Sequence, residues 1–369
     1  MAALVIGSEG LGALFDMLHD DGFIIVGPTV RDQAIVYDLL DTPNDLPIGV
    51  TDTQDGGTYR LASRPDEARF GYNLGQSSWK RFLFPPRKTL FRASNDHDGL
   101  TFETVDDPEP RYAFVGVRAC ELAAIDIQDE VLLRGNAVDR TYAARRDQAV
   151  IIAVNCGQAA ATCFCTSMGT GPRCTSGYDV VMTEVLTGTE PSYVIEAGSE
   201  RGTRLVTRLQ GRQATPGDMA TVTDVGRRAE EQIVRRMETD GLHDLLVENP
   251  SDERWDIVAQ RCLACANCTM VCPTCFCSTT EDTVGFDGVA MRSSRWDSCF
   301  SLDFSSLHGR PVRADTRSRY RQWMTHKLAT WQDQFGRIGC VGCGRCITWC
   351  PVGIDITEEV AAMREGAVA

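Results

Sequence analysis

Residues 262–273 read CLACANCTMVCP, and residues 340–351 read CVGCGRCITWCP. Both stretches have the cysteine spacing C-x2-C-x2-C-x3-C-P, which is typical of [4Fe–4S] ligands in bacterial ferredoxins. In this pattern the first three cysteines bind one cluster, and the fourth cysteine binds the neighbouring cluster. The proline ends the loop because it lacks a backbone N–H donor. We call the two stretches the first run and the second run.

The interleaved pattern predicts two sets of four ligands. The first set is Cys262, Cys265, Cys268 and Cys350. The second set is Cys340, Cys343, Cys346 and Cys272. Two clusters whose ligands are exchanged in this way must lie close together, which is what electron transfer between them requires.

Zinc and disulfide bonds are the two other common uses of clustered cysteines. Structural zinc sites usually combine two C-x2-C pairs, often with histidine, but none of the five histidines lies within either run. Disulfides need an oxidising compartment, and the N-terminus lacks the basic region and apolar stretch of a secretory signal. The sequence therefore favours iron–sulfur clusters, and a zinc-binding interaction module is the remote alternative.

The composition is that of an ordinary globular protein. The 369 residues are 43% hydrophobic, and no apolar run approaches the roughly 20 residues of a membrane helix. The net charge of −14 disfavours nucleic acid and anionic membranes as partners. Sixteen cysteines without a secretory signal point to metal binding. We therefore expect a cytoplasmic protein with no membrane span.

The order of apolar segments predicts two domains. Strand-length apolar runs at 111–117 and 148–154 flank a helical pattern at 121–133, an order that favours a crossover in a partly parallel sheet. We expect a mixed α/β domain over 1–224, a linking helix over 225–250, and an α-helical dicluster ferredoxin-like domain over 251–369. Further expected elements are a helix at 12–20 capped by Ser8, strands at 22–26, 192–197 and 204–209, a loop at 211–217, helices at 226–247 and 316–335, and a last helix capped by Thr357.

A third group of cysteines lies in the expected α/β domain. Cys156 follows one predicted strand, and Cys120 follows the preceding strand just before a helix. Because the carboxyl ends of parallel strands share one edge of a sheet, these thiols should converge with Cys163 and Cys165. A helix N-terminus also favours an anionic cluster. We predict a third [4Fe–4S] cluster on these four cysteines, with Cys174 as the runner-up for the place of Cys120.

Three more cysteines follow the first run, namely Cys275, Cys277 and Cys299. They could form a further metal site if His308, Cys174 or a partner protein supplied a fourth ligand. Packing beside the clusters explains them equally well.

Two other patterns have ordinary explanations. The glycines at 7, 10 and 12 do not form the dinucleotide fingerprint, and a helix start explains them better. The sequence shows no nucleophile–base pair, so no catalytic residues are predicted. A basic stretch either docks an acidic partner or forms a solvated helix face: Arg310, Arg313, Arg317, Arg319 and Arg321.

Several further stretches carry a family resemblance. They are residues 27–31 (GPTVR), 84–87 (FPPR), 116–122 (GVRACEL), 155–156 (NC), 163–172 (CFCTSMGTGP), 272–277 (CPTCFC), 296–299 (WDSC), 326–327 (HK) and 340–346 (CVGCGRC). Together they resemble the iron–sulfur beta subunit of soluble, sulfhydrogenase-type nickel–iron hydrogenases and its relative, the electron-transfer subunit of anaerobic sulfite reductase. The resemblance supports Cys120, which lies next to Arg118 in the family motif, whereas Cys174 looks like a local addition.

The resemblance implies a role in electron transfer. It implies that electrons pass through three [4Fe–4S] clusters between a flavin-bearing NAD(P) subunit on one side and the small and large subunits of a nickel–iron hydrogenase on the other. The alternative that it leaves open is the electron-transfer subunit of an anaerobic sulfite reductase complex. In either case the chain would have no substrate site of its own.

Overall fold

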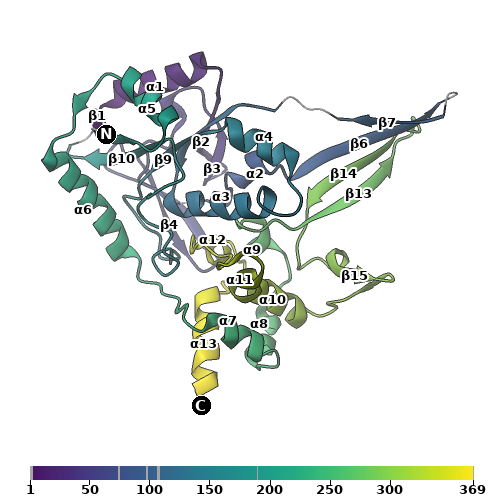
Figure 1. Cartoon of the computed structure of the whole chain (residues 1–369). Coiled ribbons are helices and arrows are strands. Elements are labelled where there is room, and N and C mark those ends of the chain that lie inside the picture. Colours follow the sequence, from purple (N-terminus) through teal and green to yellow (C-terminus); the bar gives the residue numbers. More distant parts are fainter. Residues whose placement is uncertain (1–2, 74, 97–98, 106–108, 189, 369) are drawn as a thin grey trace.

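The computed structural model of the chain describes residues 3–73, 75–96, 99–105, 109–188 and 190–368. Its largest element is an eight-stranded sheet in the amino-terminal half (Figure 1). In spatial order the strands are β12 (Arg212–Gln213), β1 (Leu4–Ile6), β11 (Pro191–Ala197), β10 (Val180–Leu186), β9 (Val150–Val154), β8 (Tyr112–Val117), β2 (Ile24–Arg31) and β3 (Ala34–Leu39). Strands β10, β9, β8 and β2 are parallel, and the outer strands pair antiparallel. The expected mixed, partly parallel sheet is confirmed.

Helices cover both faces of this sheet, which explains why its central strands are continuously apolar. All five residues of β9 are buried. One face packs against α1 (Ser8–Asp20) and α5 (Glu200–Arg208), and the other packs against α3 (Ala119–Leu132) and α4 (Arg140–Gln148). The second core also contains Trp331 and Val341 from the carboxyl-terminal half. The two halves of the chain therefore share one hydrophobic core.

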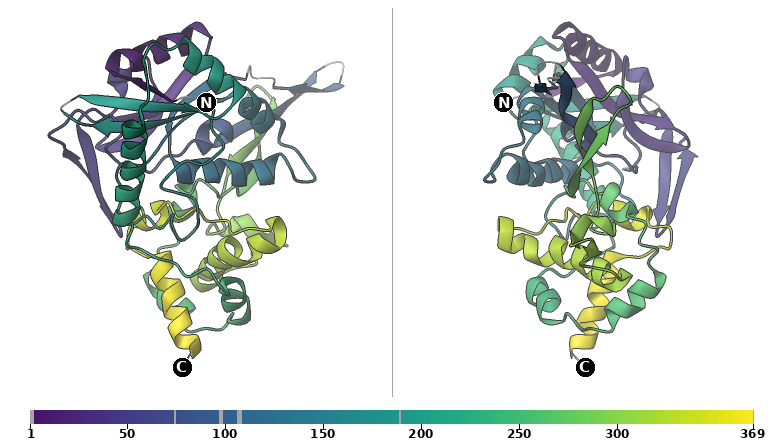
Figure 2. Two further views of the ribbon diagram at one scale, coloured as in Figure 1. Left: turned by 60° about the vertical axis from the view of Figure 1, so that its left-hand side comes forward. Right: turned by 90° about the vertical axis from the view of Figure 1, so that its right-hand side faces the viewer.

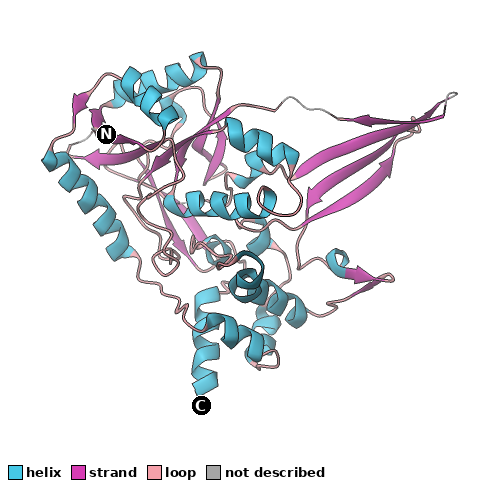
Figure 3. Cartoon of the chain, in the orientation of Figure 1, coloured by secondary structure: helices cyan, strands magenta, loops and turns pink. Residues whose placement is uncertain are grey.

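A second sheet joins the two halves and projects as a long arm (Figure 3). Its four antiparallel strands are β13 (Ser278–Val284), β14 (Ala290–Trp296), β6 (Arg87–Asp96) and β7 (Gly99–Thr104). The α-helical character expected of the carboxyl-terminal domain is therefore not confirmed, because β13 and β14 lie within it. Strands β13 and β14 are mostly polar and are held by cross-strand ion pairs such as Arg292 with Asp282, so they lack the apolar run that marks a strand.

The helices that follow residue 241 gather toward the end of the molecule that carries the C-terminus (Figure 2). They are α7 (Leu242–Glu248), α8 (Arg254–Arg261), α9 (Asn267–Met270), α10 (Thr316–Thr325), the π-helical turn η3 (His326–Thr330), α11 (Trp331–Phe335), α12 (Arg345–Thr348) and α13 (Ile356–Val368). The helix expected at 316–335 is present, with a π turn in its middle. No helix in the described part of the chain is both long and apolar enough to span a bilayer.

The other elements complete the chain. They are the 17-residue helix α6 (Pro216–Gln232), α2 (Lys80–Leu83), the hairpin of β4 (Val50–Asp55) and β5 (Thr58–Ser63), the short pair β15 (Ser306–Leu307) and β16 (Arg310–Pro311), and two 3-10 turns at Pro43–Asp45 and Asp303–Ser305.

The prediction of one linking helix at 226–247 is wrong, because this range contains the end of α6 and most of α7 with a non-helical segment between them. Helix α6 begins earlier than expected, since Pro216 and the Thr215 capping box start it. It ends at Gln232, and residues 233–239 have no regular secondary structure. Tertiary contacts hold this segment: the N–H of Met237 donates to Ser167 Oγ at 3.0 Å, and Arg235 Nε donates to Ala161 O at 3.1 Å.

Four local expectations also need correction. The strand expected at 204–209 is part of helix α5, because Ser199 caps it and accepts the N–H of Gly202. Helix α1 includes Ser8, so Gly7 is its cap. The side chain that caps α13 is the Asp355 carboxylate and not Thr357, because it accepts the N–H of Thr357 in the first turn. The loop expected at 211–217 contains the short strand β12.

Candidate metal centres

All sixteen cysteines lie in the described part of the chain, and none of them forms a disulfide. Cys265 is the exposed one, and the other fifteen are partly or fully buried. The structure therefore presents free thiols, most of them inside the protein.

The first run forms a tight loop after helix α8. Ala264 and Ala266 have positive φ angles of 52° and 66°, and the single turn α9 follows. This curl lets the N–H of Ala264 donate to Cys262 Sγ at 3.4 Å. The loop borders a pocket with apolar walls from Phe300 and Trp323. The cysteines that line this pocket are Cys262, Cys265, Cys268, Cys346 and Cys350.

The second run has the same loop conformation, with glycines at the two positive-φ positions. Gly342 and Gly344 have φ angles of 62° and 76°, and the N–H of Gly342 donates to Cys340 Sγ at 3.5 Å. These glycines also allow a close approach. A Cβ on Gly344 would lie 2.4 Å from Thr162 O, and one on Gly342 would lie 2.6 Å from Phe164 C. The second run is therefore pressed against residues 162–165.

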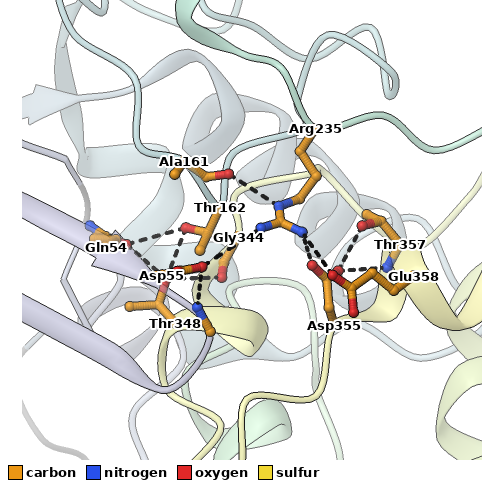
Figure 4. Close-up of polar contacts among 11 residues, drawn as sticks. Gln54, Asp55, Ala161, Thr162, Arg235, Gly344, Thr348, Asp355, Thr357 and Glu358 are labelled. Carbon is orange, nitrogen blue, oxygen red and sulfur yellow. Dashed lines mark hydrogen bonds and ion pairs between the residues drawn. The ribbon is translucent and has the colours of Figure 1, made fainter.

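Side chains lock this contact from both sides (Figure 4). The hydroxyls of Thr162 and Thr348 lie 2.9 Å apart, and Thr348 donates to Gln54 Oε1 at 2.8 Å. In the same region Arg235 pairs with Asp355, the residue that caps α13. Strand β4, the loop around Thr162 and the last helix thus meet around the second run.

The fourth cysteine of the first run lies with the second run. Burial is the main cause that raises the pKa of Cys343 and of Cys346, and that of Cys340 to about 12. Cys272 is among the nearby charges that raise all three pKa values further. A hydrogen bond from Cys275 and the charge of Lys327 lower the pKa of Cys272 itself.

The third group converges at the carboxyl edge of the large sheet. Cys120 lies in the first turn of α3, after a bulge at Gly116 that bends the end of β8. Burial raises the pKa of Cys120, Cys165 and Cys156, and that of Cys163 to about 12. Cys156 is among the charges that raise the other three pKa values.

The third group also adjoins the second run. Cys343 is among the charges that raise the pKa of Cys120, of Cys163 and of Cys165. The N–H of Phe164, which lies between Cys163 and Cys165, donates to Gly342 O at 2.9 Å. The thiols of the third group and those of the second run therefore form one continuous buried region.

A buried ion pair that the sequence reasoning missed crosses this boundary. Arg345, between two cysteines of the second run, donates to Glu121 Oε1 at 2.6 Å, and both side chains are 1% exposed. Tyr37 and Trp79 donate to Glu121 Oε2 at 2.6 and 2.8 Å. The signal available in the sequence was that Arg345 is the single charged residue in either run.

Two buried lysines, also missed, lie beside Cys272. Lys327 Nζ donates to Cys272 Sγ at 3.3 Å and to Thr274 Oγ1 at 3.1 Å. Lys80 Nζ donates to the carbonyl oxygens of Cys272 and Cys275 at 3.1 and 3.0 Å. Neither lysine has a carboxylate partner among the described residues. Burial lowers the pKa of Lys80, whereas the neighbouring Cys272 and Cys275 raise the pKa of Lys327 in spite of its burial. A buried cation at Lys327 fits a site that carries negative charge when its metal is bound.

The remaining cysteines have local partners. Cys174 Sγ donates to Val154 O at 3.7 Å. Cys275 forms a hydrogen bond with Cys272. Burial, and secondly the charge of Cys277, raise the pKa of Cys299 to about 12. His308 lies exposed in the turn between β15 and β16. In the described ranges, no three His, Cys, Asp or Glu side chains come together so that they could hold a single metal ion.

Three arginines of the basic stretch lie on α10 and bind neighbouring segments of the chain. Arg317 pairs with Asp256 of α8 at 3.0 Å, and Arg321 donates to Pro250 O at 2.6 Å. Arg319 donates to Phe300 O at 2.8 Å. These arginines hold α10 against its neighbours.

The donor sets fit [4Fe–4S] clusters. Crowded buried thiols cannot all ionise unless a positively charged partner compensates them, because burial and then mutual repulsion raise their pKa values. Iron supplies this compensation when thiolates bind it. Against the burial that raises the pKa of Cys343, the charge of Arg345 and its side-chain hydrogen bond to that thiol lower it, so this buried cation would offset the negative charge of a bound cluster.

Comparisons with known proteins agree with these sites. Residues 261–354 match the family model of the 4Fe-4S dicluster domain. Sulfhydrogenase 2 subunit beta of Pyrococcus furiosus is 30% identical over 319 residues, which cover 84% of this chain and 90% of that relative. The resemblance inferred from the sequence motifs is confirmed. The chain is an iron–sulfur electron-transfer protein, and it belongs to the family of sulfhydrogenase beta subunits.

Proposed function

We propose that the chain is an electron-transfer subunit that holds three [4Fe–4S] clusters. It would relay electrons between a flavin/NAD(P) subunit on one side and the small and large subunits of a cytoplasmic nickel–iron hydrogenase on the other. When bound, the clusters supply one-electron redox chemistry. The proposed ligand sets are Cys262, Cys265, Cys268 and Cys350; Cys340, Cys343, Cys346 and Cys272; and Cys120, Cys156, Cys163 and Cys165.

The exchange of the fourth ligands is supported by where those cysteines lie. Cys350 lines the pocket of the first run, and Cys272 lies within electrostatic reach of the second run. Without this exchange, each run would have to turn its fourth cysteine back on its own loop.

Cys120 is a better fourth ligand for the third site than Cys174. The charges that raise the pKa of Cys120 include Cys165 and Cys156, so it lies near two other members of the set. Cys156 is the one cysteine among the causes that raise the pKa of Cys174, and the Cys174 thiol donates to a backbone carbonyl. We therefore assign Cys174 to packing beside the site.

The observation that carries the relay function is the central place of the second run. Cys343 lies against the third group, and Cys346 lines the pocket of the first run. The protein would thus hold the three sites in the order third, second, first. Its residues contribute burial, which excludes water, and the cations Arg345 and Lys327, which offset the negative charge of the sites.

The test compares three cysteine variants purified without oxygen. Cys268→Ala and Cys346→Ala should each lose about four iron atoms per chain, because each removes a ligand of one cluster. Both should abolish NAD(P)H-driven electron flow through the complex. Cys174→Ala is the matched control and should keep its iron, its visible spectrum and its electron flow. Unchanged iron in both ligand variants would reject the proposal.

A further inference from the structure

The first run presents an uncharged face to solvent on a strongly charged protein. Residues 262–272 and 346–354 contain no charged residue, although the chain carries a net charge of −14. Leu263 is 63% exposed, and Met270 and Val352 are 36% and 38% exposed. We call the exposed residues of these two segments the open face: Leu263, Cys265, Asn267, Met270, Pro351 and Val352.

The open face is the outer wall of the first site. Leu263, Cys265 and Val352 line the same pocket as the partly buried cysteines Cys262 and Cys268. The face continues into a groove between the two halves of the chain. That groove is lined by Asn267, Cys350 and Pro351 on one side and by Val30, Tyr59 and Leu61, with the charged residues Asp32 and Arg60, on the other. Any protein seated here would contact a proposed cluster ligand directly.

The chain itself covers the equivalent face of the second run. Val341, the counterpart of Leu263, is 2% exposed and packs in the core shared with the large sheet. The cover over Gly342 and Gly344 is the loop that carries Cys163 and Cys165. In this molecule, therefore, the face of a cysteine run is closed by a segment that brings the next redox site.

We propose that the open face is the docking site for a partner protein that carries its own redox cofactor behind an uncharged, apolar surface. This inference rests on the proposed electron-transfer function. The absence of charge on the open face selects a partner surface without charge, since a charged group buried there would have no counter-ion. The Cys265 ligand is then where electrons cross between the two proteins.

The test places a charge on the open face within the whole complex. Leu263→Glu and Met270→Glu are each co-expressed with the other hydrogenase subunits and purified without oxygen through a tag on this chain. Val138→Glu, at a 54% exposed position between α3 and α4, is the matched control. The measurements are iron per chain, the ratio of co-purifying subunits and the rate of NAD(P)H-driven electron transfer.

We expect both open-face variants to keep their iron while one redox subunit is lost and the electron-transfer rate falls at least tenfold. The control should match the wild type in all three measurements. Met270 does not line the pocket of the first site, so its variant decides the matter if Leu263→Glu loses iron.

Three outcomes would overturn the inference. One is a Met270→Glu complex with wild-type subunit ratio and rate, which would leave the relay function untouched. A second is that the substitutions only convert a dimer of this chain to a monomer, because the face would then bind a second copy. The third, a wild-type protein without iron, would instead remove the proposed function itself.

Discussion

The two cysteine runs have the same spacing and the same loop conformation, yet one lies open and the other is enclosed. Position by position, exposed Leu263 corresponds to buried Val341, and exposed Asn267 corresponds to buried Arg345. The turn residues Ala264 and Ala266 correspond to Gly342 and Gly344.

The difference shows that the cysteine spacing is enough to form the loop, whereas the packing around each loop determines which residue types fit at its other positions. Alanine tolerates a positive φ at a cost of about 1–2 kcal/mol, so glycine is not required for the curl itself. Glycine is required in the second run because backbone atoms of residues 162–165 occupy the space of a Cβ. The second run can therefore form fully only when the amino-terminal half is folded around it.

The largest difference between the two runs should appear when the charge that only the second run carries is removed. Arg345→Met should lower the free energy of unfolding by about 3 kcal/mol or more, because it leaves Glu121 buried without its cation. Asn267→Ala, at the equivalent position of the first run, should change it by less than about 0.5 kcal/mol because Asn267 is exposed. Anaerobic urea unfolding followed by tryptophan fluorescence measures both. Equal effects would mean that the two positions do not differ in burial.

Exchanging the turn residues tests the close approach. Gly344→Ala should destabilise the protein by about 2–3 kcal/mol, since it adds a left-handed backbone penalty to a clash with Thr162 O. The reverse change in the first run, Ala266→Gly, relieves a positive φ and should stabilise by less than about 1 kcal/mol. The same unfolding experiment, with iron per chain as a second readout, checks both. A neutral Gly344→Ala would contradict the contact with residues 162–165.

The smallest effect expected is a change of redox potential confined to the second run. Lys327→Gln removes a cation from Cys272 Sγ and should lower the potential of that cluster by tens of millivolts, since the reduced state carries more negative charge. A one-electron potential moves about 59 mV per tenfold change in relative stability, so this effect is about 1 kcal/mol or less. Redox titration monitored by electron paramagnetic resonance measures it. Lys80→Gln is the control, because Lys80 bonds carbonyls and not a sulfur. Equal shifts of the reduction potential in both variants would show that the contact between Lys327 and the Cys272 sulfur does not set the potential.

Much of the candidate site could be predicted from the sequence because cluster ligands obey strict spacing. The exchange of Cys272 and Cys350 is predicted from loop length, and the roles of Cys120 and Cys156 are predicted from the rule that parallel strands end at one edge; these ligand assignments stay predictions. The polar arm strands β13 and β14 could not be predicted, because their stability comes from cross-strand ion pairs and from β6, which lies far away in the sequence.

What the sequence determined by itself was the pattern of thiols and the apolar strands, because spacing and periodicity are local properties of the chain. What only the tertiary structure decided was which run is enclosed. Arg345 binds Glu121, which lies 224 residues away in the sequence, and Lys327 binds Cys272, which lies 55 residues away. Buried charges must find partners wherever the fold provides them, and no local pattern specifies where that is. The same physical reason leaves the face around Cys265 open to solvent, since no described segment of this chain folds over it.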